Sequence, residues 1–368
     1  MNKFTVDVCV AGQGPAGIII VRQLACAGLS VMIIDSPNHT IHKFGETLPG
    51  SAIRLLNKLG LQSVTDSLLN TQSTHQNNSS RVAGNMSFWG SDSALVTDAL
   101  YDPYGCGLRI DRQKFDALLT QHADIEGIQK IYSHILNLKR DQNIWNITLE
   151  TGESIATKWV VDATGRSAKI IHLLGIQRHR GMPLVALYRT FIPEKNSLLN
   201  KTIISANQHG WCYAGKISAQ NWVIGYHTTP KIAAKLHNAP VHWDEIIRKN
   251  TTITELFTNI TFGKNVFCHD ARSSWLKQSF GEGWIACGDA LLAFDPIAGQ
   301  GLFNAIYTAM KAAETIVQFE QNKQITHQYS TEVNQIIKTY ESRRSALYQQ
   351  EQRWLNSPFW KTHRMILG

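Results

Sequence analysis

The chain has 368 residues, of which 43% are hydrophobic, which is enough to bury a full core and to form two lobes. Lys and Arg (36) exceed Asp and Glu (28) by 8, but the basic residues are scattered and fit no zinc-finger, RNP or helix-turn-helix pattern, so we expect no nucleic-acid partner. The six cysteines form no Cys-x-x-Cys, no secretion signal precedes the first strand-like run, and no apolar run reaches the roughly 18 residues of a membrane span. We therefore expect a soluble, cytoplasmic monomer with no metal site and no membrane contact.

The first predicted elements alternate between strand and helix. Residues 5–11 form a short β-branched and apolar run, residues 15–27 predict a helix, and residues 30–34 predict a second buried strand that ends at Asp35. Residues 70–80 are rich in Asn, Gln, Ser and Thr, which indicates a loop or a crossing between lobes.

The residue pattern changes further along the chain. Residues 111–123 predict a helix, and residues 145–150 and 159–161 predict strands. From 182 to about 263, aromatic and β-branched runs predict a mostly antiparallel sheet. A strand at 284–287 and two long helices at 302–321 and 329–352 complete the prediction.

The turn between the first strand and the first helix carries the run Gly12-Gln13-Gly14-Pro15-Ala16-Gly17. In a dinucleotide fingerprint the first glycine makes a tight turn, the second lets the backbone approach a pyrophosphate, and the third permits close helix packing. The helix N-terminus offers N–H groups to an anion. Asp35, eighteen residues past Gly17, would accept hydrogen bonds from a ribose hydroxyl. These features predict a dinucleotide site without choosing between NAD and FAD.

A second glycine-rich turn far downstream narrows the choice. It consists of Gly288-Asp289-Ala290, Asp295-Pro296 and Gly299-Gln300-Gly301, and it precedes a predicted helix. Together with the first fingerprint and the run Asp162 to Gly165, it resembles the three FAD signatures of the flavoprotein monooxygenases of the p-hydroxybenzoate hydroxylase fold.

This resemblance implies roles for individual residues. Asp289 would contact the ribityl chain of FAD, and the backbone N–H groups of Gly299 to Leu302 would lie near the flavin pyrimidine carbonyls. Arg112 matches an arginine that reaches the cofactor in this family. Lys43, Gly45 and Glu46 belong to a stretch that lies near the flavin. The implied cofactor-binding residues are Gly12, Gly14, Pro15, Ala16, Gly17, Asp35, Lys43, Gly45, Arg112, Asp162, Gly165, Gly288, Asp289, Pro296, Gly299, Gln300, Gly301 and Leu302.

Several further segments resemble a narrower group, the flavoproteins that mature tryptophylquinone enzymes, which belong with the tryptophan halogenase-like monooxygenases. These segments are Phe88-Trp89-Gly90-Ser91, Pro103-Tyr104-Gly105, Asp111-Arg112 with Phe115-Asp116, Gly210-Trp211-Cys212-Tyr213-Ala214 and the tail from Glu351 to Trp360. Relatives in that group serve lysine oxidase, glycine oxidase or quinohaemoprotein amine dehydrogenase. The tail also predicts a helix that docks on the core through Trp354, Phe359 and Trp360.

The narrower resemblance implies oxygen insertion into a tryptophan side chain of a precursor protein, so that a quinone cofactor can form in that partner. FAD and molecular oxygen would carry the chemistry, with reduction by NAD(P)H or by a separate reductase. A base could take the ring proton, and the candidate catalytic residues are Glu46, from the cofactor-side motif, and His227, from a strand-like run.

Three other functions stay open. A halogenase would use a similar flavin site, but the halogenase segment Trp-x-Trp-x-Ile-Pro is replaced by Trp211-Cys212-Tyr213-Ala214-Gly215-Lys216. A small-molecule aromatic hydroxylase is the second. The third is a maturation chaperone that binds FAD without turnover, because Asp35 is one methylene shorter than the glutamate of many relatives and could weaken FAD retention.

The expected fold is α/β, with a Rossmann-like FAD-binding domain, a smaller antiparallel β substrate domain and a helical C-terminal extension. We expect the FAD-binding domain to comprise residues 1–69, 105–176 and 262–325. The substrate domain would comprise 70–104 and 177–261, and the extension 326–368. The substrate should enter between the two domains, since pockets favour such junctions.

Overall fold

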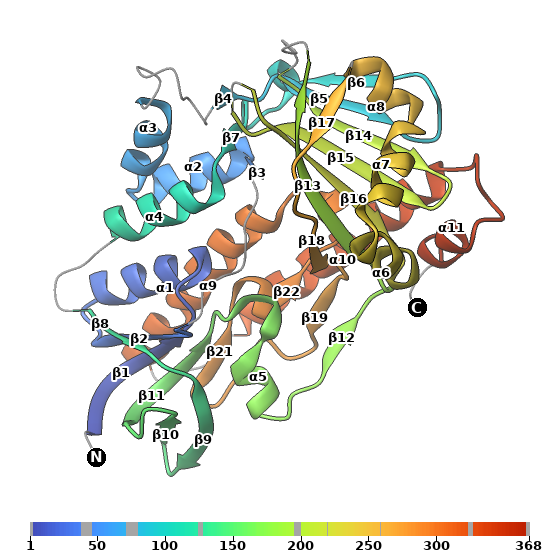
Figure 1. Cartoon of the computed structure of the whole chain (residues 1–368). Helices are drawn as coiled ribbons and strands as arrows, with labels where there is room; N and C mark the ends of the chain where they lie inside the picture. The colour runs from blue at the N-terminus through green and yellow to red at the C-terminus, as the bar shows by residue number, and fades with distance from the viewer. Residues whose placement is uncertain are drawn as a thin grey trace.

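The computed structural model describes residues 3–37, 46–70, 80–123, 128–194, 200–218, 220–257, 259–322 and 327–365. A mainly parallel sheet with its helices occupies one end of the molecule and a large antiparallel sheet the other (Figure 1). None of the described helices is long and apolar enough to cross a bilayer.

The mainly parallel sheet forms because its central strands each contain a continuous buried apolar run, at residues 8–11, 31–34 and 159–161, which suits burial on both faces. Its order is β20-β21-β11-β1-β2-β8, with β10 paired to β11 and β9 to β10. β1 and β11 run parallel from the pair Lys3 and Ser154 to the pair Ala11 and Asp162. The strands are β1 (Lys3–Ala11), β2 (Val31–Asp35), β8 (Gln129–Tyr132), β9 (Ile135–Asp141), β10 (Ile144–Leu149), β11 (Ser154–Asp162), β20 (Phe280–Gly281) and β21 (Trp284–Ala286).

Helices α1 (Pro15–Cys26) and α9 (Gly301–Asn322) pack against each other beside this sheet, and α4 (Arg112–Ala123) packs on α1 (Figure 1). All three helices were predicted, and no end lies more than one residue from its predicted position. α4 begins at Arg112 because the Asp111 carboxylate accepts from the Lys114 N–H at 3.0 Å, which caps the helix. The short helix α5 (Lys169–Leu173) follows β11.

A small sheet and two helices near it were not predicted. The sheet has the order β3-β7-β4, with β3 (Glu46–Leu48), β4 (Ser80–Arg81) and β7 (Leu108–Ile110). β3 leads directly into α2 (Gly50–Lys58), which contacts α9, and α3 (Gln62–Asn70) follows. α2 buries Ala52, Leu55 and Leu56, which have the spacing of one face of a helix.

The antiparallel sheet has the order β17-β13-β16-β15-β14-β5-β6, with β18 also paired to β13, and only its β14–β5 pair is parallel among the described strands. One of its faces is covered by three helices that the sequence did not predict, so the region from 182 to 263 is less uniformly β than expected. The strands are β5 (Gly84–Phe88), β6 (Leu95–Asp98), β13 (Val185–Pro193), β14 (Thr202–Asn207), β15 (Gly210–Lys216), β16 (Trp222–Thr228), β17 (Ile260–Phe262) and β18 (Phe267–Asp270), and the helices are α6 (Pro230–Asn238), α7 (Pro240–Arg248) and α8 (Thr251–Leu256).

Burial of large apolar side chains holds those helices on the sheet. Trp222 and Phe257 contact each other edge to face with ring centroids 4.6 Å apart, and Trp243 is fully buried in the same cluster. β18 belongs to this sheet, so the domain boundary expected at residue 261 falls before the last strand of the antiparallel layer.

A third layer joins the two ends of the molecule. The sheet β12-β19-β22 comprises β12 (Arg178–Arg180), β19 (Ser274–Leu276) and β22 (Leu292–Ala293). It is followed by α9 and then by α10 (Gln328–Gln350) and α11 (Pro358–His363). The long helix predicted at 329–352 therefore exists, and it ends two residues early because residues 351–357 turn away before α11.

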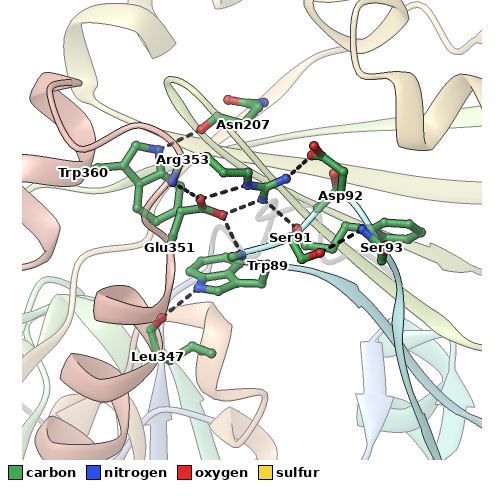
Figure 2. Close-up of polar contacts among 12 residues, drawn as sticks. Trp89, Ser91, Asp92, Ser93, Asn207, Leu347, Glu351, Arg353 and Trp360 are labelled. Carbon is green, nitrogen blue, oxygen red and sulfur yellow. Dashed lines mark hydrogen bonds and ion pairs between the residues drawn. The ribbon is translucent and has the colours of Figure 1, made fainter.

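The tail docks on the free face of the antiparallel sheet, as the aromatic run predicted. Phe359 and Trp360 are buried, and the Trp360 indole N–H donates to the Asn207 carbonyl at 2.8 Å (Figure 2). Trp354 is only partly buried and stacks on Trp360 with ring centroids 6.2 Å apart. The docking was therefore correctly predicted.

Candidate functional site

The turn between β1 and α1 contains three glycines, and the physical reason for glycine differs from one position to the next. Gly12 has a φ of +104°, and a Cβ there would lie 2.3 Å from the Ala163 carbonyl oxygen. A Cβ on Gly17 would lie 1.9 Å from the Gly12 oxygen. A Cβ on Gly14 would meet nothing within 4 Å. Gly12 and Gly17 are thus required by packing, whereas Gly14 leaves the start of α1 open to a ligand.

The turn Gly288–Ala290 lies against this first turn, although 270 residues separate them in sequence. A Cβ on Gly288 would lie 2.8 Å from the Ala16 methyl group, and the Gly288 N–H donates to the Thr308 hydroxyl at 2.8 Å. The Asp289 carboxylate is half-exposed and forms an ion pair with Arg166 at 3.6 Å. All three predicted signatures therefore meet beside the N-terminus of α1, because Ala163 of the third lies against Gly12 of the first.

The third signature has a supporting role that the sequence did not reveal. The Asp162 carboxylate is fully buried and accepts from the N–H and hydroxyl of Thr164 at 3.0 and 2.7 Å and from the Ile171 N–H at 2.9 Å. Burial raises the pKa of Asp162, and these hydrogen bonds partly oppose the shift. Because its oxygens serve its own turn and α5, Asp162 shapes the loop that ends at Gly165 rather than reaching a ligand.

The turn Asp295–Gly301 opens toward solvent at its glycines. Asp295 accepts from the Ile297 N–H at 3.1 Å and starts the single turn Pro296–Ala298, after which Gly299 has a φ of +61°. A Cβ on Gly299 or Gly301 would meet nothing within 4 Å. Gln300 and Gly301 are exposed, and Leu302 is buried in the first turn of α9.

These residues fit FAD. Two helix N-termini, those of α1 and α9, present N–H groups that have no partner within the helix, which suits the anionic pyrophosphate and the polar edge of a flavin. The amide nitrogen of Asn304, one turn into α9, is buried and has no hydrogen-bond acceptor in the part of the chain that the structure describes. A buried amide without a partner is costly, and an acceptor on the cofactor would satisfy it.

The remaining predicted cofactor residues lie in different settings. Asp35, at the end of β2, is buried and accepts from the Ser36 N–H at 2.9 Å. The Nε of Arg112 pairs with Asp116 one helical turn away at 2.9 Å. Lys43 and Gly45 lie outside the described residues. The main chain of Glu46 pairs with Ile110 on β7, and its side chain is not among those described.

His227 does not suit the role of a base. Its ring is buried and stacked on the Trp211 indole, with centroids 3.6 Å apart and planes 5° apart. Burial lowers the pKa of His227 to about 3, against hydrogen bonds to the backbone of Trp211 and Gly225. The imidazole is therefore a weakly basic packing group, and the expectation of a catalytic His227 is corrected.

His227 and His363 make the fold sensitive to acid. Burial, and for His363 also the positive charge of Arg344, lowers the pKa of each ring to about 3, whereas both titrate near 6.5 when unfolded. The unfolded chain then binds more protons below pH 6.5, so stability present at neutral pH is lost as the pH falls from 6.5 toward 3. We expect each histidine to contribute a loss of about 1.4 kcal/mol per pH unit below pH 6. Urea unfolding at pH 7 and pH 5 measures it, and a His363→Gln variant with an unchanged pH slope would contradict it.

Arg109 on β7 is a residue that sequence reasoning passed over. Its guanidinium is buried, and its hydrogen-bond acceptors among the described residues are the hydroxyl groups of Thr47 at 2.8 Å, Tyr213 at 2.9 Å and Thr202 at 3.2 Å. A Cβ on Gly215 would lie 2.6 Å from Nη1, so the glycine makes room for the charge. Arg109 thereby ties β3, on the cofactor side, to β14 and β15 of the antiparallel sheet.

Asp295 links the glycine turn to helix α10. Its Oδ2 accepts from the Tyr348 hydroxyl at 2.8 Å and lies 3.4 Å from the Arg344 Nε, and Tyr348 in turn accepts from the Trp211 indole N–H at 3.1 Å. Ile297 packs against the same face of the antiparallel sheet. The turn that would contact the flavin is thus held by α10 and the antiparallel sheet together.

Comparisons with known proteins agree with this geometry. The chain is 23% identical over 363 residues to a protein named an FAD-dependent oxidoreductase, LodB, of Marinomonas mediterranea, and the match covers 96% of each chain. The solved flavin-dependent halogenase CmlS superposes with a TM-score of 0.85 at 20% identity, covering 99% of this chain and 68% of CmlS. Peptidyl tryptophan dihydroxylase QhpG, essential for tryptophylquinone cofactor biogenesis, gives 0.74 at 19% identity, covering 98% of this chain and 79% of QhpG.

These superpositions confirm the predicted α/β flavoprotein fold. A family described as the FAD binding domain matches residues 5–351, nearly the whole chain. The chain therefore belongs to this FAD-binding family and is an FAD-dependent oxidoreductase.

Proposed function

We propose that this protein is a flavin-dependent monooxygenase that hydroxylates a tryptophan side chain of a precursor protein during tryptophylquinone cofactor biogenesis. The observation that carries the proposal is the match to LodB along 96% of both chains, together with the fold shared with QhpG, whose name states that chemistry. We propose that the protein acts in the cytoplasm, where it and the precursor would be synthesised, and that it is a monomer.

The face of the antiparallel sheet opposite α6–α8 suits an aromatic substrate. Tyr188, Tyr213 and Gly225 lie side by side on β13, β15 and β16, and Ile297 of the glycine turn packs against the same face. We propose that the indole lies between this face and the flavin, in keeping with our division into an FAD-binding domain and a substrate domain.

Bound FAD would supply the activation of molecular oxygen, after reduction by NAD(P)H or by a separate reductase. The chain's own residues would bind the cofactor and orient the substrate. The N–H groups at the start of α1 and α9 would hold the cofactor, Arg109 would fix β3 against the antiparallel sheet, and the aromatic face would exclude water from the reacting carbon.

Co-expression with the precursor of a tryptophylquinone enzyme tests the proposal. The expected result is a precursor tryptophan whose mass has gained one or two oxygen atoms, only when the flavoprotein is present. A Gly14→Ala variant, which should not retain FAD, is the control. A precursor of unchanged mass beside a fully yellow flavoprotein would remove the proposal.

Glu46 remains our proposed base for the ring proton. Glu46→Gln keeps the size of the side chain and removes its basicity, so we expect unchanged FAD content and at least about a hundredfold slower product formation. Turnover equal to that of the unaltered protein would show that Glu46 is not the base.

Halogenation is the second candidate, because the structure of CmlS superposes at a TM-score of 0.85. It predicts that added bromide changes the mass of the product by a bromine atom. A product mass that does not depend on bromide would count against halogenation and leave hydroxylation as the proposed reaction.

A further inference from the structure

β6 is the last strand of the antiparallel sheet and pairs only with β5 among the described residues. The Ala99 N–H donates to the Ala83 carbonyl at 3.0 Å, and the Thr97 oxygen lies against Gly84, so the main chain at 97 and 99 faces β5. Because main-chain groups alternate along a strand, the N–H and C=O of Val96 point to the open edge. β6 thus offers unpaired hydrogen-bonding groups along one side.

The same segment exposes large apolar side chains. Leu95 is 70% exposed, Leu100 84% and Tyr101 88%, and Val96 and Tyr104 are also exposed. Edge strands of soluble proteins usually carry lysine, proline or a bulge that prevents pairing with another chain. β6 reads Leu-Val-Thr-Asp, so it carries no lysine, proline or bulge, and its one charged side chain, Asp98, stands at its end. An open apolar edge of this kind is typical of a docking site.

The loop that connects β5 to β6 is anchored by the end of α10 and by the tail (Figure 2). The Trp89 indole N–H donates to the Leu347 carbonyl at 2.7 Å, and the Gly90 N–H donates to the Glu351 carboxylate at 2.8 Å. Arg353 bonds Glu351 at 2.6 Å and also pairs with Asp92. The edge is therefore a presented surface rather than a frayed strand.

Charge and position indicate what the edge receives. Residues 91–104 contain Asp92, Asp98 and Asp102 but no Lys or Arg, in a chain of net charge +8. Asp98 pairs with Lys201 at 3.5 Å, and its carboxylate stays partly exposed. Asp92 is 93% exposed, so it faces solvent as well as Arg353. The segment then continues into β7, which carries Arg109, and the carbonyl groups of Tyr104 and Gly105 lie against Gly50 at the start of α2. A basic chain docked on β6 would be brought toward the cofactor side.

We propose that β6 and the segment to Tyr104 bind an extended, basic stretch of the precursor polypeptide by β-strand addition, so that its tryptophan is delivered to the junction of the two sheets. The identity of the partner rests on the proposed function. Main-chain hydrogen bonds to Val96 provide the pairing, the exposed leucines and tyrosines bury its apolar side chains, and the carboxylates favour lysine and arginine.

Binding of a short fluorescein-labelled peptide of alternating valine and lysine to the FAD-loaded full chain tests the docking surface itself. Val96→Pro removes only the outward N–H and places a ring at the edge, so we expect about tenfold weaker binding. Val96→Thr keeps the N–H and the branched shape and should bind as the unaltered protein does. Tyr101→Ser, which leaves the backbone untouched, should also weaken binding, and a peptide with glutamate in place of lysine should not bind.

The FAD content and melting temperature of the three variants should equal those of the unaltered chain. The proposal would be overturned if the peptide did not bind, or if Val96→Pro bound it as tightly as the unaltered chain does. It would also be overturned if the unaltered chain were a dimer that Val96→Pro made monomeric, because the edge would then bind a second copy of this chain. In co-expression, Val96→Pro should lower oxygen addition to the precursor and Val96→Thr should not. Absence of oxygen addition by the unaltered protein would count against the proposed function, while peptide binding would still stand by itself.

Discussion

Gly14→Ala is expected to yield a protein that folds normally but does not retain FAD. Gly14 is the N-cap of α1 with φ −73° and ψ −179°, a conformation open to alanine, and the new methyl group would meet no protein atom within 4 Å. We expect the free energy of unfolding of the apoprotein to change by less than about 0.5 kcal/mol. The methyl group would stand where the pyrophosphate must approach the backbone, so FAD affinity should fall about a hundredfold or more.

Gly17→Ala is the matched comparison, three residues away in the same turn. Its methyl group would lie 1.9 Å from the Gly12 oxygen, which is main chain and cannot move aside cheaply. We expect it to destabilise the apoprotein itself by about 3 kcal/mol or more. A comparison of the two variants thus distinguishes a glycine that FAD binding requires from a glycine that folding requires.

Urea unfolding of the apoproteins and titration with FAD, followed by flavin fluorescence, measure both effects. Gly14→Ala should share the unfolding midpoint of the unaltered chain, and Gly17→Ala should not. A yellow Gly14→Ala protein that keeps FAD through dialysis would mean that the cofactor does not approach this turn.

The start of the fold was predictable because its signals are local. A buried strand, a glycine turn and a helix with proline at its first position follow one another within 26 residues, and α1 spans Pro15–Cys26 against an expectation of 15–27. The meeting of Gly288 with Ala16 could be predicted only through the family resemblance, since no local pattern specifies a contact across 272 residues.

Side-chain direction was the part that the sequence could not provide. Asp162 sits in a cofactor signature, yet its carboxylate turns toward the start of α5, because three donors of its own loop and helix surround it. His227 lies on a strand that could have lined a pocket, but the register of β15 and β16 places it opposite Trp211 and buries it. Register and packing depend on the whole sheet.

The helices α6 and α7 were missed although each begins with a proline, Pro230 and Pro240. The surrounding aromatic and β-branched runs indicated strands, and those runs are indeed the strands on which the helices pack. Here tertiary context decided between two patterns of similar strength. Arg109 was passed over because a single arginine gives no sign of burial until its three hydroxyl partners, from three strands, are brought together.

Arg344→Met is expected to destabilise the protein by about 3 to 5 kcal/mol, the usual result of removing one partner of a buried ion pair. Arg344 is buried, its Nε lies 3.4 Å from Asp295 Oδ2, and its Nη2 lies 3.0 Å from the ring of His363. Without it the Asp295 carboxylate keeps the Tyr348 hydroxyl and the Ile297 N–H but loses its counter-charge. Arg343→Met, at the exposed neighbouring position, removes the same net charge and should cost less than about 0.5 kcal/mol.

The dependence of this loss on pH separates a charge effect from a packing effect. Burial raises the pKa of Asp295 even in the presence of Arg344, and removal of the cation should raise it further. An acid whose folded pKa is raised destabilises the fold above its unfolded pKa and ceases to do so as the pH falls through the two values. The deficit of Arg344→Met relative to the unaltered chain should therefore be largest at pH 7 and shrink toward pH 4. Because Asp295 begins the turn that would hold the flavin, FAD affinity should fall in parallel with stability at pH 7. A deficit that stays constant with pH would mean that Arg344 acts by filling space, and that its charge does not hold the turn.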